Sequence, residues 1–97
     1  MTAAASLDAA AARLRIEAQR IEQVVAAYLT PVLQLLPGVW QGPAADRLEQ
    51  QLLGHRTVLR SVARELHRRS IEFDARAAQL RAMGAPSVAE GVGAGAV

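Results

Sequence analysis

Arginines in the second half of the sequence are the most numerous side chains that could bind a partner. Four recur at every fourth position: Arg56, Arg60, Arg64 and Arg68. On a helix this spacing places them along one side, where they could hold the phosphates of an anionic membrane or of a nucleic acid. The alternatives are a solvated face that Glu65 and Glu72 partly neutralise, or contact with acidic residues of a partner helix. No aromatic side chains alternate with the arginines to stack on bases, so we expect no nucleic-acid partner and do not favour a membrane.

Residues for catalysis or metal binding are few. His55 and His67 fall on different faces of a helix, and no pattern of carboxylates around them resembles a metal motif. Cysteine is absent, which excludes thiolate metal sites and disulfides. The serines have no base near them in the sequence. We therefore expect no catalytic residue, no metal site and no cofactor, and we predict that the chain is not an enzyme.

Length and composition favour one small helical domain. The chain has 97 residues, of which 52% are hydrophobic but only three are aromatic. Alanine supplies much of the remainder, which is typical of long helices that approach closely. The net charge of +2 is modest. The fold class predicted is all-α, and the chain is too short to build a two-walled catalytic cleft.

The stretch 37–43 predicts a bend between two helices. It contains two of the four prolines, two of the seven glycines and the only tryptophan. Pro37 disfavours helical geometry before it, Gly38 can take the left-handed conformation that closes a helix, and Pro43 suits the first turn of the next helix. We expect Trp40 to fold back between the two helices, with its ring N–H bonded to a carbonyl.

A first helix is predicted over about 7–36, preceded by a flexible segment 1–6. Ser6 is a plausible N-cap, and Pro31 predicts a bend near 27–31. Apolar residues recur at seven-residue intervals, which is the pattern of a coiled-coil contact. The two columns are Leu7, Leu14, Ile21, Tyr28 and Leu35, and Ala11, Ala18, Val25 and Val32.

A second helix is predicted over about 44–83, followed by a disordered tail over 84–97 that is rich in small residues. It repeats the seven-residue pattern, and its second column becomes basic toward the end. One column is Ala45, Leu52, Leu59, Leu66, Phe73 and Leu80, and the other is Leu48, His55, Val62, Arg69 and Arg76. The two helices together predict an antiparallel hairpin over 7–83.

Such a hairpin needs a partner. Two helices bury little apolar surface, and the free energy gained from it must offset roughly 1.5 kcal/mol of conformational entropy for each ordered residue. Five apolar residues lie outside the columns and widen the apolar surface: Leu29, Leu33, Leu36, Leu53 and Val58. Two hairpins, identical or different, would give a four-helix bundle. The residues expected in the hairpin or dimer contacts are Leu14, Ile21, Tyr28, Leu35, Leu48, Leu52, Leu59, Val62, Leu66 and Phe73.

Targeting signals give only negative predictions. The N-terminus carries Asp8 where a secretory signal peptide needs a basic region. Residues 23–45 are uncharged, but prolines and glycines break this stretch, and a broken backbone cannot satisfy its hydrogen bonds in lipid. We expect neither Sec export nor a membrane span.

The run Trp40-Gln41-Gly42-Pro43-Ala44-Ala45-Asp46-Arg47-Leu48 resembles the signature of the WXG family of helical hairpins, related to the early secreted antigenic target of mycobacteria. Chain length and the central position of the motif agree with it, although Leu48 stands where the family often has phenylalanine. The resemblance implies that Trp40 and Gly42 form the hairpin motif. It also implies a substrate or chaperone-like partner of a type VII secretion system, cytoplasmic before export as a folded homodimer or heterodimer and then secreted or at the cell surface.

The sequence departs from this family at the export signal, a Tyr-x-x-x-Asp/Glu placed after the second helix. Tyr28 lies in the first predicted helix and is followed four residues later by Val32, and Phe73 is followed by Ala77. We therefore expect the chain either to travel with a signal-bearing partner, whose tail would meet the secretion ATPase, or to be a non-secreted relative. The competing function is a non-secreted helical protein that binds an anionic membrane or nucleic acid through the four arginines.

Overall fold

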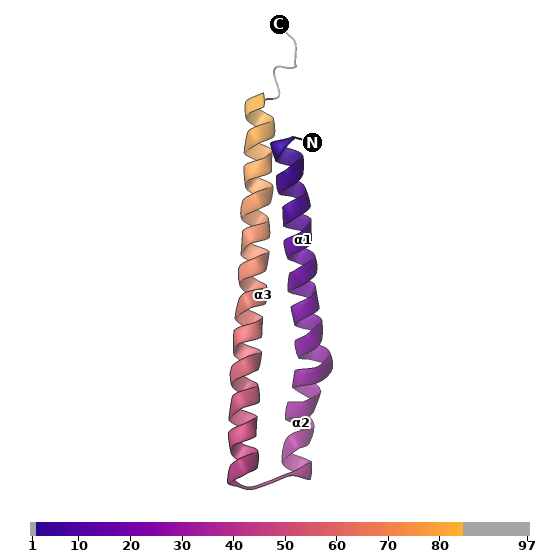
Figure 1. Ribbon diagram of the computed structural model, residues 1–97, viewed down its shortest axis with the longest axis vertical. Coiled ribbons are helices and arrows are strands. Elements are labelled where there is room, and N and C mark those ends of the chain that lie inside the picture. Colours follow the sequence, from indigo (N-terminus) through magenta and orange to yellow (C-terminus); the bar gives the residue numbers. More distant parts are fainter. Residues whose placement is uncertain (1, 85–97) are drawn as a thin grey trace, which may run out of the picture. The chain divides into compact units, whose positions relative to one another are not determined.

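The computed structural model describes residues 2–84, and every regular element in this range is helical. The elements are α1 (Ala3–Val24), the π-helix η1 (Val25–Leu29), α2 (Thr30–Val39) and α3 (Pro43–Gly84), shown in Figure 1. Residues 2–84 contain no strand, and the prediction of an all-α fold is confirmed. Of the predicted tail over 84–97, Gly84 is the last residue of α3, and the part from residue 85 onward lies outside the described residues.

Helix α1 begins at Ala3, earlier than predicted. The hydroxyl of Thr2 accepts a hydrogen bond from the N–H of Ala5 at 3.0 Å, which is the geometry of an N-cap. Ser6, the predicted cap, already donates its backbone N–H to the Thr2 carbonyl at 3.0 Å. The prediction failed because the alanines between Thr2 and Ser6 are the best helix formers and extend the helix backward.

The helix widens into one π-helical turn at η1, directly before Pro31. The N–H of Thr30 bonds to the carbonyl of Val25, five residues back, instead of to Ala26. A proline within a helix has no N–H to donate, and its ring clashes with the carbonyl four residues before it, here Ala27. A wider turn separates the ring from this carbonyl. The bend expected near 27–31 therefore takes the form of a π-helix at Val25–Leu29.

The helical segments before the bend, α1, η1 and α2, form the first arm of the chain, and α3 forms the second. The π-helix adds one residue to the spacing of the first arm and so shifts its column of buried residues. Val25 is buried, and the next buried residues are Leu33 and Leu36. Val32 and Leu35, which the regular seven-residue spacing placed in the contact, are exposed. The prediction that the two helical arms contact each other through Tyr28, Val32 and Leu35 was therefore wrong. The predicted columns assumed an uninterrupted α-helix.

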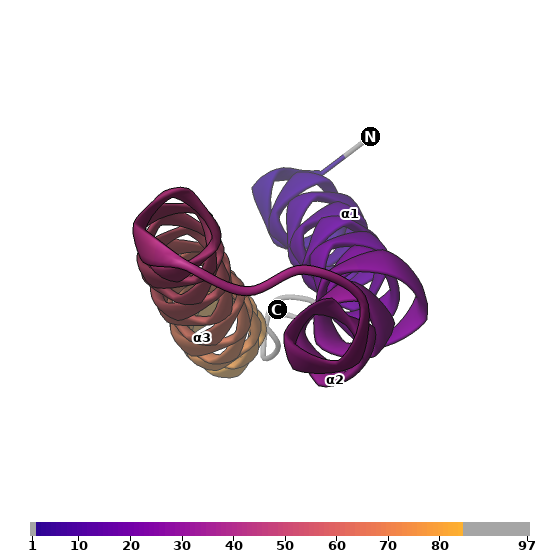
Figure 2. The same ribbon diagram turned by 90° about the horizontal axis from the view of Figure 1, so that it is seen from below.

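The bend is shorter than predicted. Pro37 and Gly38 belong to α2, and only residues 40–42 lie between α2 and α3. The chain crosses at this point from the end of α2 to the start of α3 (Figure 2). Gly42 has a φ of 114°, which a residue with a side chain rarely adopts, and its carbonyl accepts the N–H of Asp46 at 2.9 Å to start α3. Gly42, rather than Gly38, supplies the backbone freedom.

Gly42→Ala is expected to destabilise the chain by about 1 kcal/mol, because alanine is strained at this positive φ. Gly38→Ala is the matched control. Gly38 is helical, and a Cβ there would meet open space, so this change should stabilise by about 0.5–1 kcal/mol. Urea unfolding followed by circular dichroism measures both. Equal effects of the two substitutions would contradict the assignment of the turn to Gly42.

The chain divides into two compact units, and each has its own core. Unit 1 combines the chain up to Arg15 with the chain from Arg68 onward. Its buried residues are all small: Ala4, Ala11, Ser70 and Ala77. Small side chains let two helices approach closely. Arg15 bonds to Asp74 at 2.8 Å, and Arg81 bonds to Asp8. The hydrogen bond that Arg81 donates to Asp8, and then the negative charge of Asp8, raise the pKa of Arg81 above its ordinary value.

Unit 2, Ile16–His67, contains η1, α2, the bend and the adjoining parts of α1 and α3. Within it, Glu22 of α1 lies 3.8 Å from Nε2 of His67 on α3, so the two arms run side by side. Its core combines small residues with larger aliphatic ones. The buried residues are Ala18, Val25, Leu33, Leu36, Ala45 and Ala63.

The second column predicted for α3 is displaced by one residue. His55, Val62, Arg69 and Arg76 are exposed, whereas Ala63, Ser70 and Ala77 are buried. The two columns of α3 are therefore offset by four residues instead of three. The larger apolar side chains of Leu48 and Val62 favoured the wrong offset, because alanine and serine are only weak indicators of a buried position.

Candidate functional site

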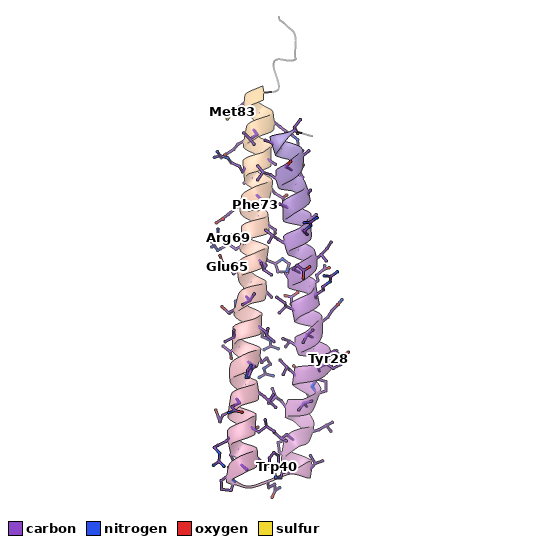
Figure 3. The ribbon with its side chains drawn as sticks, in the orientation of Figure 1. Tyr28, Trp40, Glu65, Arg69, Phe73 and Met83 are labelled. Atoms are coloured by element: carbon purple, nitrogen blue, oxygen red, sulfur yellow. The ribbon has the colours of Figure 1, made fainter. Side chains whose placement is uncertain are left out.

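An exposed row of apolar side chains follows the outer side of the first arm of unit 2. Its members recur at intervals of four and three residues, which aligns them on one helix face. They are Val24, Tyr28, Val32, Leu35 and Val39. Tyr28 is 68% and Leu35 is 66% exposed. Figure 3 shows Tyr28 projecting away from α3.

Helix α3 adds two exposed apolar residues of unit 2, Val58 and Val62. Arg60 and Arg64 mark one flank of the contact between the arms, because they share a recess with Glu22. At 3.6 residues per turn, Val58 and Val62 fall on the opposite flank of α3 from these arginines. Tyr28 and its row likewise fall on the opposite flank of the first arm from Glu22.

Both rows therefore lie on the same side of unit 2. We name this surface the apolar face, defined by Tyr28, Val32, Leu35, Val39, Val58 and Val62. Monomeric soluble proteins rarely leave contiguous apolar patches uncovered, whereas interaction sites commonly do. The apolar face is the strongest candidate for a binding surface in the described part of the chain.

Trp40 lies at the bend, and 46% of its surface is exposed. Its backbone N–H bonds to the carbonyl of Leu36 at 3.0 Å. Its ring borders a small recess of about 120 Å³ together with Pro37, Ala45 and Glu49. The predicted hydrogen bond from the ring N–H was wrong, since the indole makes none within residues 2–84. Nearly half of the surface of Trp40 therefore remains available for contact with another molecule.

The remaining residues predicted to pack are half-buried in the single chain. They are Leu14, Ile21, Leu48, Leu52, Leu59, Leu66 and Phe73. Tyr28, Leu35 and Val62 differ from them and belong to the apolar face. Val32 and Val39 complete this face, although neither was singled out as a binding residue. The available signal was a set of apolar doublets, Tyr28-Leu29, Val32-Leu33 and Leu35-Leu36, which supply one residue for each of two faces.

The four predicted arginines do not form one uniform stripe. Arg68 belongs to unit 1 and pairs with Glu72. Arg56 is half-buried in unit 2. Arg60 and Arg64 are exposed and form no ion pair within residues 2–84. Of the four arginines, Arg60 and Arg64 are therefore the two that are both exposed and without an ion pair in the described part of the chain.

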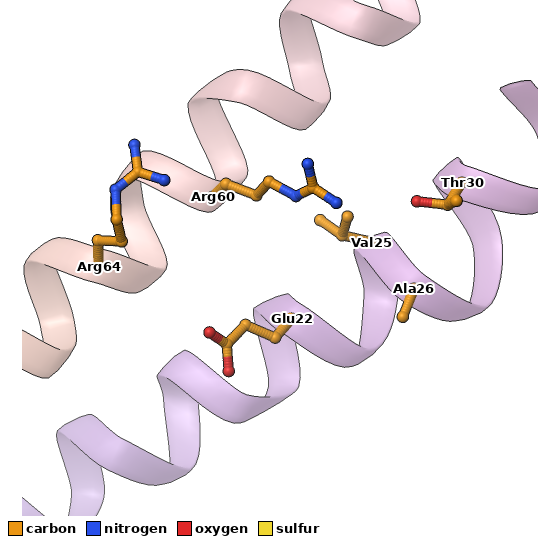
Figure 4. Close-up of a pocket in the computed structure, with 6 residues that line it drawn as sticks. All are labelled: Glu22, Val25, Ala26, Thr30, Arg60 and Arg64. Carbon is orange, nitrogen blue, oxygen red and sulfur yellow. The ribbon is translucent and has the colours of Figure 1, made fainter.

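Arg60 and Arg64 border a recess of about 500 Å³ beside the π-helix. The other lining residues are Glu22, Val25, Ala26 and Thr30. Figure 4 shows the Arg60 side chain extending from α3 toward Val25, with the hydroxyl of Thr30 directed back toward it. The recess combines cationic donors, one carboxylate and an apolar floor. We name it the arginine recess.

The histidines lie apart from each other. His55 is exposed, and His67 is half-buried near Glu22. Residues 2–84 contain no group of three or more potential ligands that could hold a metal ion. In the same range, no helix has both the length and the apolar character required to cross a bilayer.

No family model, no curated protein and no solved structure matches this chain.

Proposed function

We propose that this chain is a non-enzymatic helical-hairpin protein that acts by pairing with a second hairpin, as a substrate or chaperone-like component of a type VII secretion system. The proposal combines the resemblance of the run from Trp40 to Leu48 to the WXG family with the apolar face. The paired hairpins form a four-helix bundle in this proposal. The chain is cytoplasmic when it pairs and is then secreted or displayed at the cell surface.

The observation that carries the proposal is the apolar face of unit 2. Its α2 row has the four-and-three spacing with which a helix packs against another helix. The π-helix brings Leu33 and Leu36 of α2 into the core of unit 2 while Val32 and Leu35 face outward. An apolar helix with two contact faces suits an inner position in a bundle of more than two helices.

The competing function, binding of an anionic membrane or nucleic acid along the whole arginine stripe, has less support. Arg68 is neutralised by Glu72, and Arg56 is half-buried. The two remaining arginines supply too little charge for a surface that depends on many phosphate contacts. Pairing between hairpins is therefore the function that we favour.

Leu35→Glu is expected to weaken pairing at least about tenfold, because it brings a charge into a desolvated apolar contact. Gln34→Glu adds the same charge at the neighbouring exposed position, outside the apolar face, and should leave pairing unchanged. Sedimentation equilibrium measures pairing. Export is measured as the amount of each tagged variant in the culture filtrate of an actinobacterial host that has an active type VII system and supplies a signal-bearing partner hairpin.

The proposal expects the wild-type chain and Gln34→Glu in the filtrate, and Leu35→Glu retained in the cells. A host whose secretion ATPase is inactivated should retain all three chains. Filtrate amounts that do not depend on the ATPase would contradict the assignment to type VII secretion. Equal pairing by the two glutamate variants would contradict the role of the apolar face.

A further inference from the structure

We propose that the arginine recess binds a phosphate group. Arg60 and Arg64 lie one turn apart on α3, and neither has an ion pair within residues 2–84. Two like charges at this spacing repel each other, so an anion between them relieves an unfavourable interaction. Each guanidinium has several N–H donors in a fixed fork, which suits the oxygens of a phosphate.

Thr30 supplies a third donor from the opposite wall. Its hydroxyl borders the recess and makes no hydrogen bond within residues 2–84. The π-helix determines this position, since Thr30 follows η1 and gives its backbone N–H to Val25. A phosphate has enough oxygens to accept from both arginines and from Thr30 in different directions, whereas a carboxylate offers only two oxygens in one plane.

The residues that line the recess also include a carboxylate and one helix residue whose carbonyl lacks its usual donor. The carbonyl of Ala26 lacks its usual helical donor, because Thr30 donates to Val25 and Pro31, one residue farther, has no N–H. Glu22 adds a carboxylate to the same recess. The negative charge of Glu22 opposes a bound anion, so a phosphate or phosphate monoester that retains one O–H fits better than a fully ionised one. Its O–H can donate to the Ala26 carbonyl while its other oxygens accept from the arginines.

The arginine recess and the apolar face lie on opposite flanks of the contact between the two arms. A hairpin docked on Tyr28, Val32 and Leu35 therefore leaves Arg60 and Arg64 accessible. Phosphate binding and pairing are separable, and failure of one does not imply failure of the other. The phosphate can belong to a free molecule or to a lipid headgroup, and the experiment below distinguishes these sources.

The test titrates the full chain with inorganic phosphate and follows the arginine Nε–H resonances by NMR. A second arm measures co-sedimentation with vesicles of phosphatidylcholine containing phosphatidic acid, with pure phosphatidylcholine vesicles as the blank. Arg60→Gln/Arg64→Gln should lower affinity at least about tenfold. Arg13→Gln/Arg47→Gln removes the same charge from exposed positions outside the recess and should change affinity little.

Glu22→Gln should change the affinity for phosphate in the opposite direction. Removal of the carboxylate should tighten phosphate binding, whereas Glu49→Gln, which alters net charge equally but lies outside the arginine recess, should not. Saturable binding in the phosphate arm supports a free phosphate, and binding to the phosphatidic acid vesicles alone supports a headgroup. Equal losses in the two arginine double variants, or no saturable binding in either arm, would overturn the proposal. Leu35→Glu should retain phosphate binding even where pairing is lost.

Discussion

Leu36→Ala is expected to lower the free energy of unfolding by about 2–4 kcal/mol at every protein concentration, because it leaves a cavity in the core of unit 2. Leu36 is only 8% exposed, whereas its neighbour Leu35 is 66% exposed. Leu35→Ala should cost about 0.5 kcal/mol or less in the unpaired chain and more only where the chain is paired. Urea unfolding over a series of protein concentrations separates the two variants.

This comparison tests the register that the π-helix imposes. In an uninterrupted α-helix the seven-residue spacing would bury Leu35 and expose Leu36. A larger loss for Leu35→Ala than for Leu36→Ala at all concentrations would show that the first arm does not have the register described here. Equal concentration-independent losses would contradict the separation of α2 into two faces.

Ala11→Leu should destabilise unit 1 by about 1–3 kcal/mol, because no space exists for three additional carbons at a position with zero exposure. The expected cause is separation of α1 from the part of α3 around Ser70 and Ala77, which are also buried and small. Hydrogen exchange of the backbone amides of α1 up to Arg15 measures the loss locally.

Ala12→Leu is the matched control for this prediction. It makes the same substitution one residue later, at an exposed position of the same helix, and should change stability by less than about 0.5 kcal/mol. If Ala11→Leu were tolerated as well as Ala12→Leu, the small residues of unit 1 would not determine how closely its helices pack.

The helical content could be predicted from sequence because composition and apolar periodicity both indicate helices, and this prediction is confirmed. The local register could not. Pro31 signals a disturbance, but a bend and a π-helix are alternative responses to the same missing N–H, and only the second displaces every later residue by one position. The doublets at 28–29, 32–33 and 35–36 left both registers apolar.

The position of the turn and the buried column of α3 could not be predicted from the sequence either. Both Gly38 and Gly42 can take positive φ, and the sequence favoured Gly38 because Pro37 precedes it. The helix instead continues through Pro37, and Gly42 makes the turn. In α3, the buried column consists of alanine and serine, whose small side chains pack between helices without giving a strong hydrophobic signal.

The candidate sites could be predicted only in part. The arginines were evident from their spacing, and so was Glu72 as a partner four residues after Arg68. The recess beside Arg60 depends on which helix faces meet. Thr30 and Glu22 gave no signal, because they come together with the arginines only through the fold. The apolar face contains Tyr28 and Leu35 for the same reason: η1 rotates them outward.

The most direct test of the central claim, that the chain acts by pairing with another hairpin, is its mass in solution by light scattering, with helicity measured on the same sample by circular dichroism. A helical species near twice 10.3 kDa would support self-pairing. A poorly helical chain that becomes helical only when co-expressed with a different hairpin would support obligate pairing with that partner. A fully helical, cooperatively unfolding monomer of 10.3 kDa would contradict the claim, because the apolar face would then be stable without a partner.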